Sequence, residues 1–154
     1  MICSDDVFRV IRNRFRVEVE TPYPDDFDVI YDNEDADRVP EEGTTWCRWT
    51  VLPGDSQLVS IGSTPRYRSW GLAVASIFVP INTGTKAANE IAHRIIAAFR
   101  TVTDQCVKFR VPRITHIGRS GRFHQVNVTC PYESDEIRGY PFTKGFSGGF
   151  EAYG

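Results

Sequence analysis

The chain has 154 residues, 41% hydrophobic and 25% charged, which predicts one domain of ordinary composition and excludes collagen-like, coiled-coil and wholly disordered classes. The net charge of −2 is unevenly distributed, because residues 1–42 carry 13 acidic and 5 basic side chains whereas residues 43–154 carry 7 acidic and 13 basic ones. No stretch approaches the roughly 18 apolar residues that span a bilayer and the N-terminus does not have the order of a signal peptide, so we expect a protein made in the cytoplasm without membrane contact.

The first predicted element is an amphipathic helix that starts near Ser4. A serine cap followed by two aspartates stabilises the first turn of a helix. Apolar side chains then recur at helical spacing, at Val7, Ile11 and Phe15. These residues predict a helix with one buried face.

An acidic stretch interrupted by prolines follows, over residues 21–44. It predicts an extended surface connection with a short strand at residues 29–31. The carboxylates lack the alternate spacing and the glycine of a helix-loop-helix calcium site, so we do not expect a dedicated metal site here.

The period changes to two from residue 44. Residues 44–52 predict a strand that ends at Pro53-Gly54-Asp55, and residues 55–68 are then expected to form a linker. The strand over residues 70–80 is apolar or small on both faces, which is typical of a central strand.

The second half continues with a helix over residues 86–102, whose apolar residues form a continuous stripe. Two strand-like runs joined by a turn at residues 118–121 predict a β-hairpin. The domain is expected to span residues 1–139. Residues 140–154 interleave glycines with aromatic residues and predict an extended C-terminal arm that docks on a neighbour, or else a tail without a role.

No residues form a recognisable catalytic or cofactor motif. The four widely spaced cysteines predict reduced structural thiols. A zinc site at His116, His124 and Cys130 would lack closely spaced ligand pairs, and no phosphate loop or nucleophile elbow is present. A pI near 5.9 and a scattered basic set argue against a dedicated nucleic-acid reader. We therefore expect no enzyme activity and no cofactor.

Three segments carry a family resemblance: VIYDN, the run from WCRWTVLPGDSQ through GLAVASIFVPINTG to AHRIIAAFR, and KFRVPRITHIGRSGRFHQVNVTCPY. In this order the chain resembles the tail-terminator-like proteins of siphophages and related prophages, over about residues 5–135. The shared features fall on Asn33, Trp46, Trp49, Gly62, Arg66, Gly71, Phe78, Pro80, Gly84, Phe99, Val128 and Pro131. The acidic insert at residues 32–43 and the C-terminal aromatic segment depart from the family pattern.

The resemblance implies an α/β (α+β) fold in which a mixed, largely antiparallel sheet carries two main helices on one face. It also implies a structural virion protein that forms a homo-oligomeric ring, usually a hexamer. Such a ring caps the head-proximal end of the tail tube, stops polymerisation at the length set by the tape-measure protein, and meets the head-side connector. Genomic DNA would pass through the lumen without sequence-specific binding.

Other functions remain open on the sequence alone. Another neck or connector component, or a tube-like ring subunit, would share the same features. A small hydrolase or metal-dependent enzyme, or a monomeric host-side binding module, would belong to a different class.

Two sets of residues are expected to take part in assembly. Mixed arginine and aromatic side chains suit interface hot spots, so the predicted interface comprises Arg66, Tyr67, Arg68, Trp70, Arg119, Arg122, Phe142, Phe146 and Phe150. The alternative is that Trp70 is a core residue and that the arginines merely solubilise the chain. Because a DNA-conducting lumen should not be strongly basic, an acidic set is expected to face the lumen or the tube end: Asp25, Asp26, Asp28, Asp32, Glu34, Asp35 and Asp37.

Overall fold

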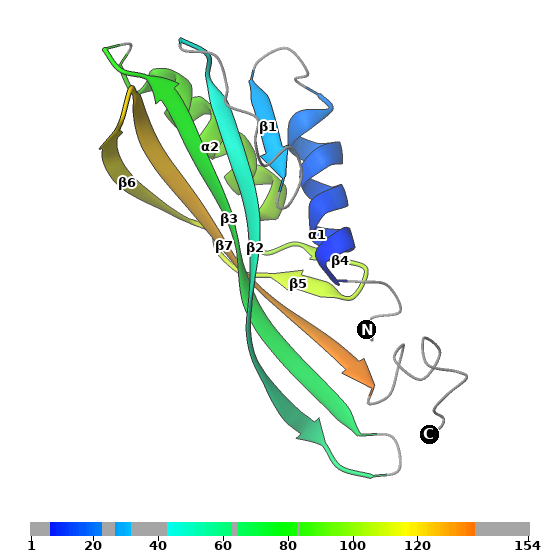
Figure 1. Cartoon of the computed structure of the whole chain (residues 1–154). Helices are drawn as coiled ribbons and strands as arrows, with labels where there is room; N and C mark the ends of the chain where they lie inside the picture. Colours follow the sequence, from blue (N-terminus) through cyan, green and yellow to red (C-terminus); the bar gives the residue numbers. More distant parts are fainter. Residues whose placement is uncertain (1–6, 23–26, 32–42, 63–64, 83, 138–154) are drawn as a thin grey trace, which may run out of the picture.

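The computed structural model describes residues 7–22, 27–31, 43–62, 65–82 and 84–137 (Figure 1). Its helical elements are α1 (Val7–Phe15), the π-helical turn η1 that continues it (Arg16–Glu20), and α2 (Lys86–Phe99). Its strands are β1 (Asp28–Tyr31), β2 (Trp46–Ser60), β3 (Arg66–Pro80), β4 (Thr103–Asp104), β5 (Val107–Phe109), β6 (Arg113–Ser120) and β7 (Phe123–Ile137).

The strands form one mixed sheet in the order β1-β2-β3-β7-β5-β4, with β6 also paired to β7. Within the described strands, β1 and β2 run parallel and every other pair is antiparallel. The strand expected over residues 70–80 is part of β3 and is central, as its two-sided apolar pattern predicts, because β3 lies between β2 and β7. The α+β fold class is therefore confirmed.

Both helices cover the same face of the sheet, and the main core lies between the two layers. Successive strand residues point to opposite faces. On β3 the residues that face the helices, from Ala73 to Val79 at every second position, are fully buried. The centre of this core is aromatic: the ring of Phe15 stacks on Trp49 at a centroid distance of 4.3 Å, and Phe99 lies 5.3 Å from Trp49.

The opposite face of the sheet is covered by no helix of the described chain. A small aromatic cluster occupies one end of it, where Trp46 stacks on Phe78 at 4.2 Å and Phe123 packs edge-on against both rings. We call this side the outer face.

Three long strands continue beyond the helices and form a projecting arm (Figure 1). The arm comprises residues 53–60 of β2, 66–71 of β3 and 133–137 of β7. The prediction that Pro53-Gly54-Asp55 ends the strand is wrong, and the expected linker is instead part of the arm. A register shift between Pro53 and Ser56 accommodates the proline, which a bulge or an edge strand tolerates because the missing N–H is not needed there.

The β-hairpin prediction is confirmed with shifted boundaries. The hairpin is β6–β7, but its turn is Gly121-Arg122, because Ser120 pairs directly with Phe123. The first of the two strand-like runs, residues 106–118, is two strands, β5 and β6, separated around Pro112, and both pair with β7.

The cysteines differ from the expectation at one position. Cys47 and Cys130 are buried free thiols, whereas Cys106 is disulfide-bonded. The prediction of reduced thiols is therefore wrong for Cys106. Spacing along the sequence gave no signal for this bond, because a disulfide depends on which residues the fold brings together.

Candidate assembly surface

The first predicted interface cluster lies on the arm. Arg66, Tyr67, Arg68 and Trp70 belong to β3, where alternation places Arg66, Arg68 and Trp70 on the outer face and Tyr67 on the other. A strand holds these side chains in fixed directions, which the expected linker would not do.

Arg68 is held within its own subunit by two carboxylates of β7. Its Nε and Nη2 donate hydrogen bonds to Oδ1 and Oδ2 of Asp135 at 2.8 and 3.1 Å, and its Nε lies 3.4 Å from Oε2 of Glu133. These bonds lower the pKa of the Asp135 carboxyl and raise that of the guanidinium. Arg110 donates to the other oxygen of Glu133. The four residues form an ion-pair network that joins β3, β7 and the end of β5.

Trp70 marks the base of the arm, which we call the waist. It is half-buried and lies outside the core clusters, so it is not a core residue. In the adjacent row of the outer face, Leu52 and Leu72 are cross-strand partners and Leu72 also faces Pro131. Leu52 is 48% exposed and Leu72 is 39% exposed. The waist therefore presents an apolar patch across three strands.

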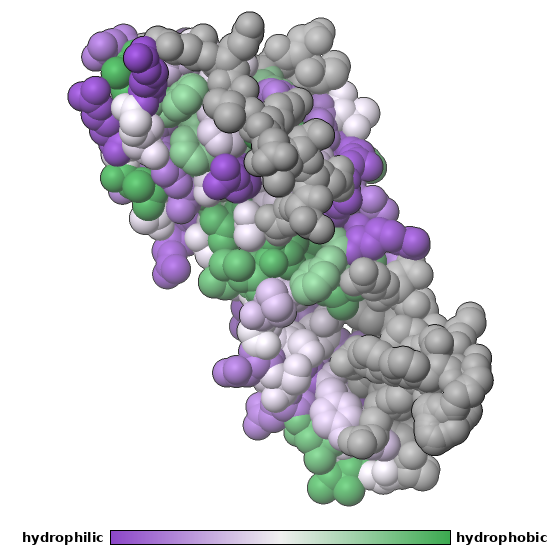
Figure 2. Space-filling view, viewed as in Figure 1, coloured by the Kyte–Doolittle hydropathy of each residue, from purple (hydrophilic) through white to green (hydrophobic). Residues whose placement is uncertain are grey.

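A cavity of about 290 Å³ opens at this patch, lined by Gly54, Trp70, Gly71, Leu72, Arg110, Pro131 and Tyr132. We call it the waist cavity. The backbone N–H of Arg110 donates to the Pro131 carbonyl at 2.9 Å, which places this segment beside the waist cavity. The next residue, Val111, is 62% exposed. Figure 2 shows hydrophobic side chains gathered where the body narrows into the arm.

The arm also ends in apolar side chains. Leu58 and Val59 are 45% and 39% exposed, and Ile61 just beyond β2 is 92% exposed. A second hydrophobic area marks this end of the molecule in Figure 2. Contiguous exposed apolar surface on a folded chain commonly marks an interaction site.

The second predicted cluster, Arg119 and Arg122, lies at the β6–β7 turn, at the opposite end of the sheet from the arm (Figure 1). The structure therefore does not bring the two clusters together within one subunit. Both arginines are exposed, and Nε of Arg119 donates to the Gly121 carbonyl at 3.2 Å.

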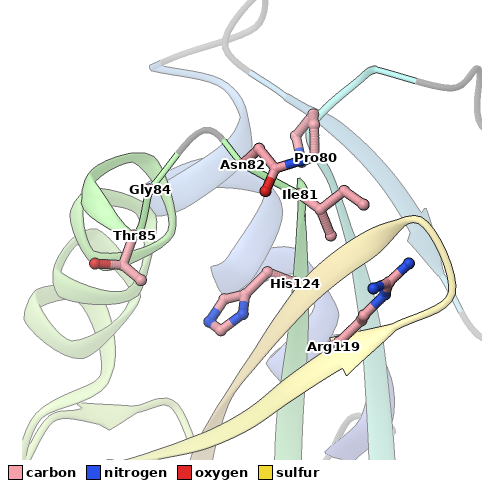
Figure 3. A pocket seen from close by; sticks show the side chains of 7 residues that line it. All are labelled: Pro80, Ile81, Asn82, Gly84, Thr85, Arg119 and His124. Atoms are coloured by element: carbon pink, nitrogen blue, oxygen red, sulfur yellow. The ribbon is translucent and has the colours of Figure 1, made fainter.

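A cavity of about 510 Å³ lies beside this turn, lined by Pro80, Ile81, Asn82, Gly84, Thr85, Arg119 and His124 (Figure 3). Its two basic side chains diverge: His124 extends toward α2, and Arg119 extends away from that helix. The lining thus offers no converging set of groups for a ligand.

The remaining predicted residues lie outside the described part of the chain. These are Phe142, Phe146 and Phe150 of the aromatic segment, and Asp25, Asp26, Asp32, Glu34, Asp35 and Asp37 of the acidic set. Asp28 is described; it begins β1 and is half-buried. The orientation of the acidic set stays a prediction.

Sequence reasoning missed several residues that make the waist, above all Leu52, Leu72, Glu133 and Asp135. The period-two pattern of residues 66–70, with Arg66, Arg68 and Trp70 on one side, was the signal that could have extended the strand into the expected linker.

Two further properties bear on function. Among the described residues, no group of three or more His, Cys, Asp or Glu side chains is placed to hold a metal ion. Neither described helix combines the length and apolar character needed to cross a membrane.

Comparisons with known proteins give the family. No curated protein matches the sequence. A solved structure that carries no functional name has a similar fold, with a TM-score of 0.58 and 18% sequence identity, over 89% of this chain and 99% of that one. The family model described as phage tail terminator protein matches residues 11–132, which include both helices and most of the sheet. The chain therefore belongs to the phage tail terminator protein family, a family of structural components of the virion tail.

Proposed function

We propose that this protein acts without enzymatic activity, as a ring of identical subunits that caps the head-proximal end of a siphophage tail tube. The ring stops tube polymerisation at the length set by the tape-measure protein and provides the joint to the head-side connector. Membership of the tail terminator family carries the proposal. The ring, expected to be a hexamer, is assembled in the host cytoplasm and becomes part of the virion.

The arm supports the assembly step. A projecting ribbon of two or three strands is marginally stable by itself, and here it exposes Leu58, Val59 and Ile61 at one end. Along residues 52–60 of β2, the described strands provide a partner on one side only, which is β3. Unprotected strand edges with apolar side chains favour pairing with another chain. The arm therefore suits contact with a neighbouring subunit.

The two ends of the subunit support the ring geometry. A head-to-tail interface joins two different surfaces of the same subunit, and it closes into a ring when the rotation between neighbours permits. This subunit has unlike ends: an apolar arm at one, and the exposed Arg119 and Arg122 at the other.

The lumen is proposed to be acidic. The N-terminal 42 residues carry a balance of −8, and their carboxylates, Asp28 among them, would line the lumen or the tube-facing side. Like charge keeps duplex DNA from binding the wall during passage. No sequence-specific DNA contact is part of the proposal.

Electron microscopy of the purified protein, alone and mixed with tail tubes, tests this function. We expect rings on the tube ends, and tubes that no longer elongate when fresh tube subunits are added. Open tube ends that continue to grow in the presence of folded protein would overturn the proposal.

A further inference from the structure

The waist cavity has the chemistry of a receptor for an aromatic side chain. Trp70 contributes aromatic surface, and Leu72 and Pro131 contribute apolar surface. Aromatic rings bind in such sites through burial and through offset or edge-on ring contacts.

One charged group lies at the edge of this cavity. The Arg110 side chain is 58% exposed and is held by Glu133, whose side chain is only 11% exposed. A guanidinium fixed beside a ring adds a cation–π attraction. The cavity therefore favours a phenylalanine or a tyrosine over an aliphatic side chain.

We propose that the waist cavity binds an aromatic side chain from the C-terminal segment, residues 138–154, of a second copy of this chain. This segment lies outside the described residues, but its sequence and its starting point are known. It contains five aromatic residues: Tyr140, Phe142, Phe146, Phe150 and Tyr153. The inference rests on the proposed ring, and it names the contact between neighbours.

The place where β7 ends favours a second copy over the chain's own cavity. Ile137 pairs with Arg66, six residues beyond the row of Leu72 and Pro131, which is about 20 Å along a strand. At this end β7 points away from the waist (Figure 1). The described part of the chain therefore ends away from its own cavity.

The length of the segment suffices for such a contact. Residues 138–154 number 17, and an extended chain spans about 3.3 Å per residue, or roughly 56 Å in total. The contact would be heterologous, with a donor segment on one side and a receptor cavity on the other. That is the type of interface that closes a ring.

Engineered cysteine pairs test where the segment binds. Leu72 is replaced by cysteine, and in five separate proteins one aromatic residue of the segment is also replaced by cysteine: Tyr140, Phe142, Phe146, Phe150 or Tyr153. After mild oxidation of the assembled rings, we expect a ladder of covalent multimers on non-reducing gels for at least one pair. Monomers containing an internal cross-link, or no cross-link from any pair, would overturn the inference.

The controls use the chain's own features. The single variants Leu72→Cys and Phe146→Cys should give no ladder, and the free thiols Cys47 and Cys130 are buried and should stay unreactive. Ring formation is scored by electron microscopy on the same samples. Rings that cap tubes but never cross-link refute this contact and leave the proposed function standing, whereas absent rings and uncapped tubes with the unmodified protein refute the function itself.

A charge placed in the cavity gives a second test. Leu72→Asp alters a side chain that is 39% exposed, so the subunit should still fold. We expect the concentration needed for half-maximal ring assembly to rise at least about tenfold. The matched control is Ala97→Asp on the exposed side of α2, outside both the arm and the cavity lining, and it should have a much smaller effect. Equal effects of the two variants would contradict the cavity's role.

Discussion

Arg68 of β3 and Asp135 of β7 are direct cross-strand partners, and the guanidinium donates to both oxygens of the carboxylate, at 2.8 and 3.1 Å. This pair lies on the arm beside the waist, with Glu133 at 3.4 Å from the same guanidinium. The residue predicted to contact a neighbour therefore also fixes the direction of the arm within its own subunit.

The first prediction concerns the pH dependence of the arm. The hydrogen bonds from Arg68 lower the pKa of Asp135, so their stabilisation is fully present above the unfolded value of about 3.9 and is lost as the pH falls through the lower folded pKa. In Arg68→Met, the pKa of Asp135 should rise toward its ordinary value, and amide exchange along residues 66–69 should accelerate at neutral pH. Carboxyl NMR titration and hydrogen exchange measure the two effects.

Arg66→Met is the control, because Arg66 acts on Asp135 through charge alone and more weakly. An unchanged Asp135 titration in Arg68→Met would show that the pair does not form in solution.

The second prediction concerns the base of the arm. A Cβ atom at Gly54 would lie 2.6 Å from the backbone carbonyl oxygen of Trp70, which is too close without a shift of one strand. Gly54→Ala should therefore destabilise the protein by about 1–3 kcal/mol, the usual cost of overpacking. Thermal unfolding measures this, with Gln57→Ala as a control on the exposed part of the same strand. Equal melting temperatures for Gly54→Ala and the unmodified protein would refute the close approach.

The third prediction concerns the core beneath the helices. Phe15 is fully buried and stacks on Trp49, whereas Phe8 on the same helix is 45% exposed. Phe15→Ala should lower the free energy of unfolding by about 3–5 kcal/mol. Phe8→Ala should change it by no more than about 0.5 kcal/mol. Chemical denaturation of both variants measures the two losses of unfolding free energy. Similar losses would mean that α1 does not present the face described here.

The accuracy of the sequence predictions varied with the range of the interactions involved. Helix α2 and the central strand β3 were predictable because their apolar periodicity is local and strong. The arm was not, because Pro53 and Gly54 normally interrupt strands and only pairing with β3 shows that a register shift accommodates them.

The candidate site also combined features that local sequence patterns predict with contacts between distant residues that they do not. Trp70 and Arg68 could be selected for their residue types, whereas the apolar patch of the waist needed Leu52, Leu72 and Pro131 to come together from three strands. Pairing across strands far apart in the sequence is not visible in local patterns.

The fourth prediction concerns thiol reactivity. Burial raises the pKa of the Cys130 thiol to about 12 and also raises that of Cys47. Iodoacetamide at pH 8 should therefore label neither residue in the folded protein and both after unfolding in urea. Mass spectrometry of the digested protein gives the result, and a Leu58→Cys variant on the exposed arm is the positive control. Rapid labelling of Cys130 without urea would contradict its burial.

The central claim, that this protein terminates the tail tube, is tested most directly by the lengths of tubes assembled in infected cells. The comparison is between a phage lacking the gene for this chain and the same phage complemented with it. We predict tubes of uniform length with the protein present, and tubes that extend well past that length, without attached heads, when it is missing. Tubes of the same uniform length in both cases would contradict the claim.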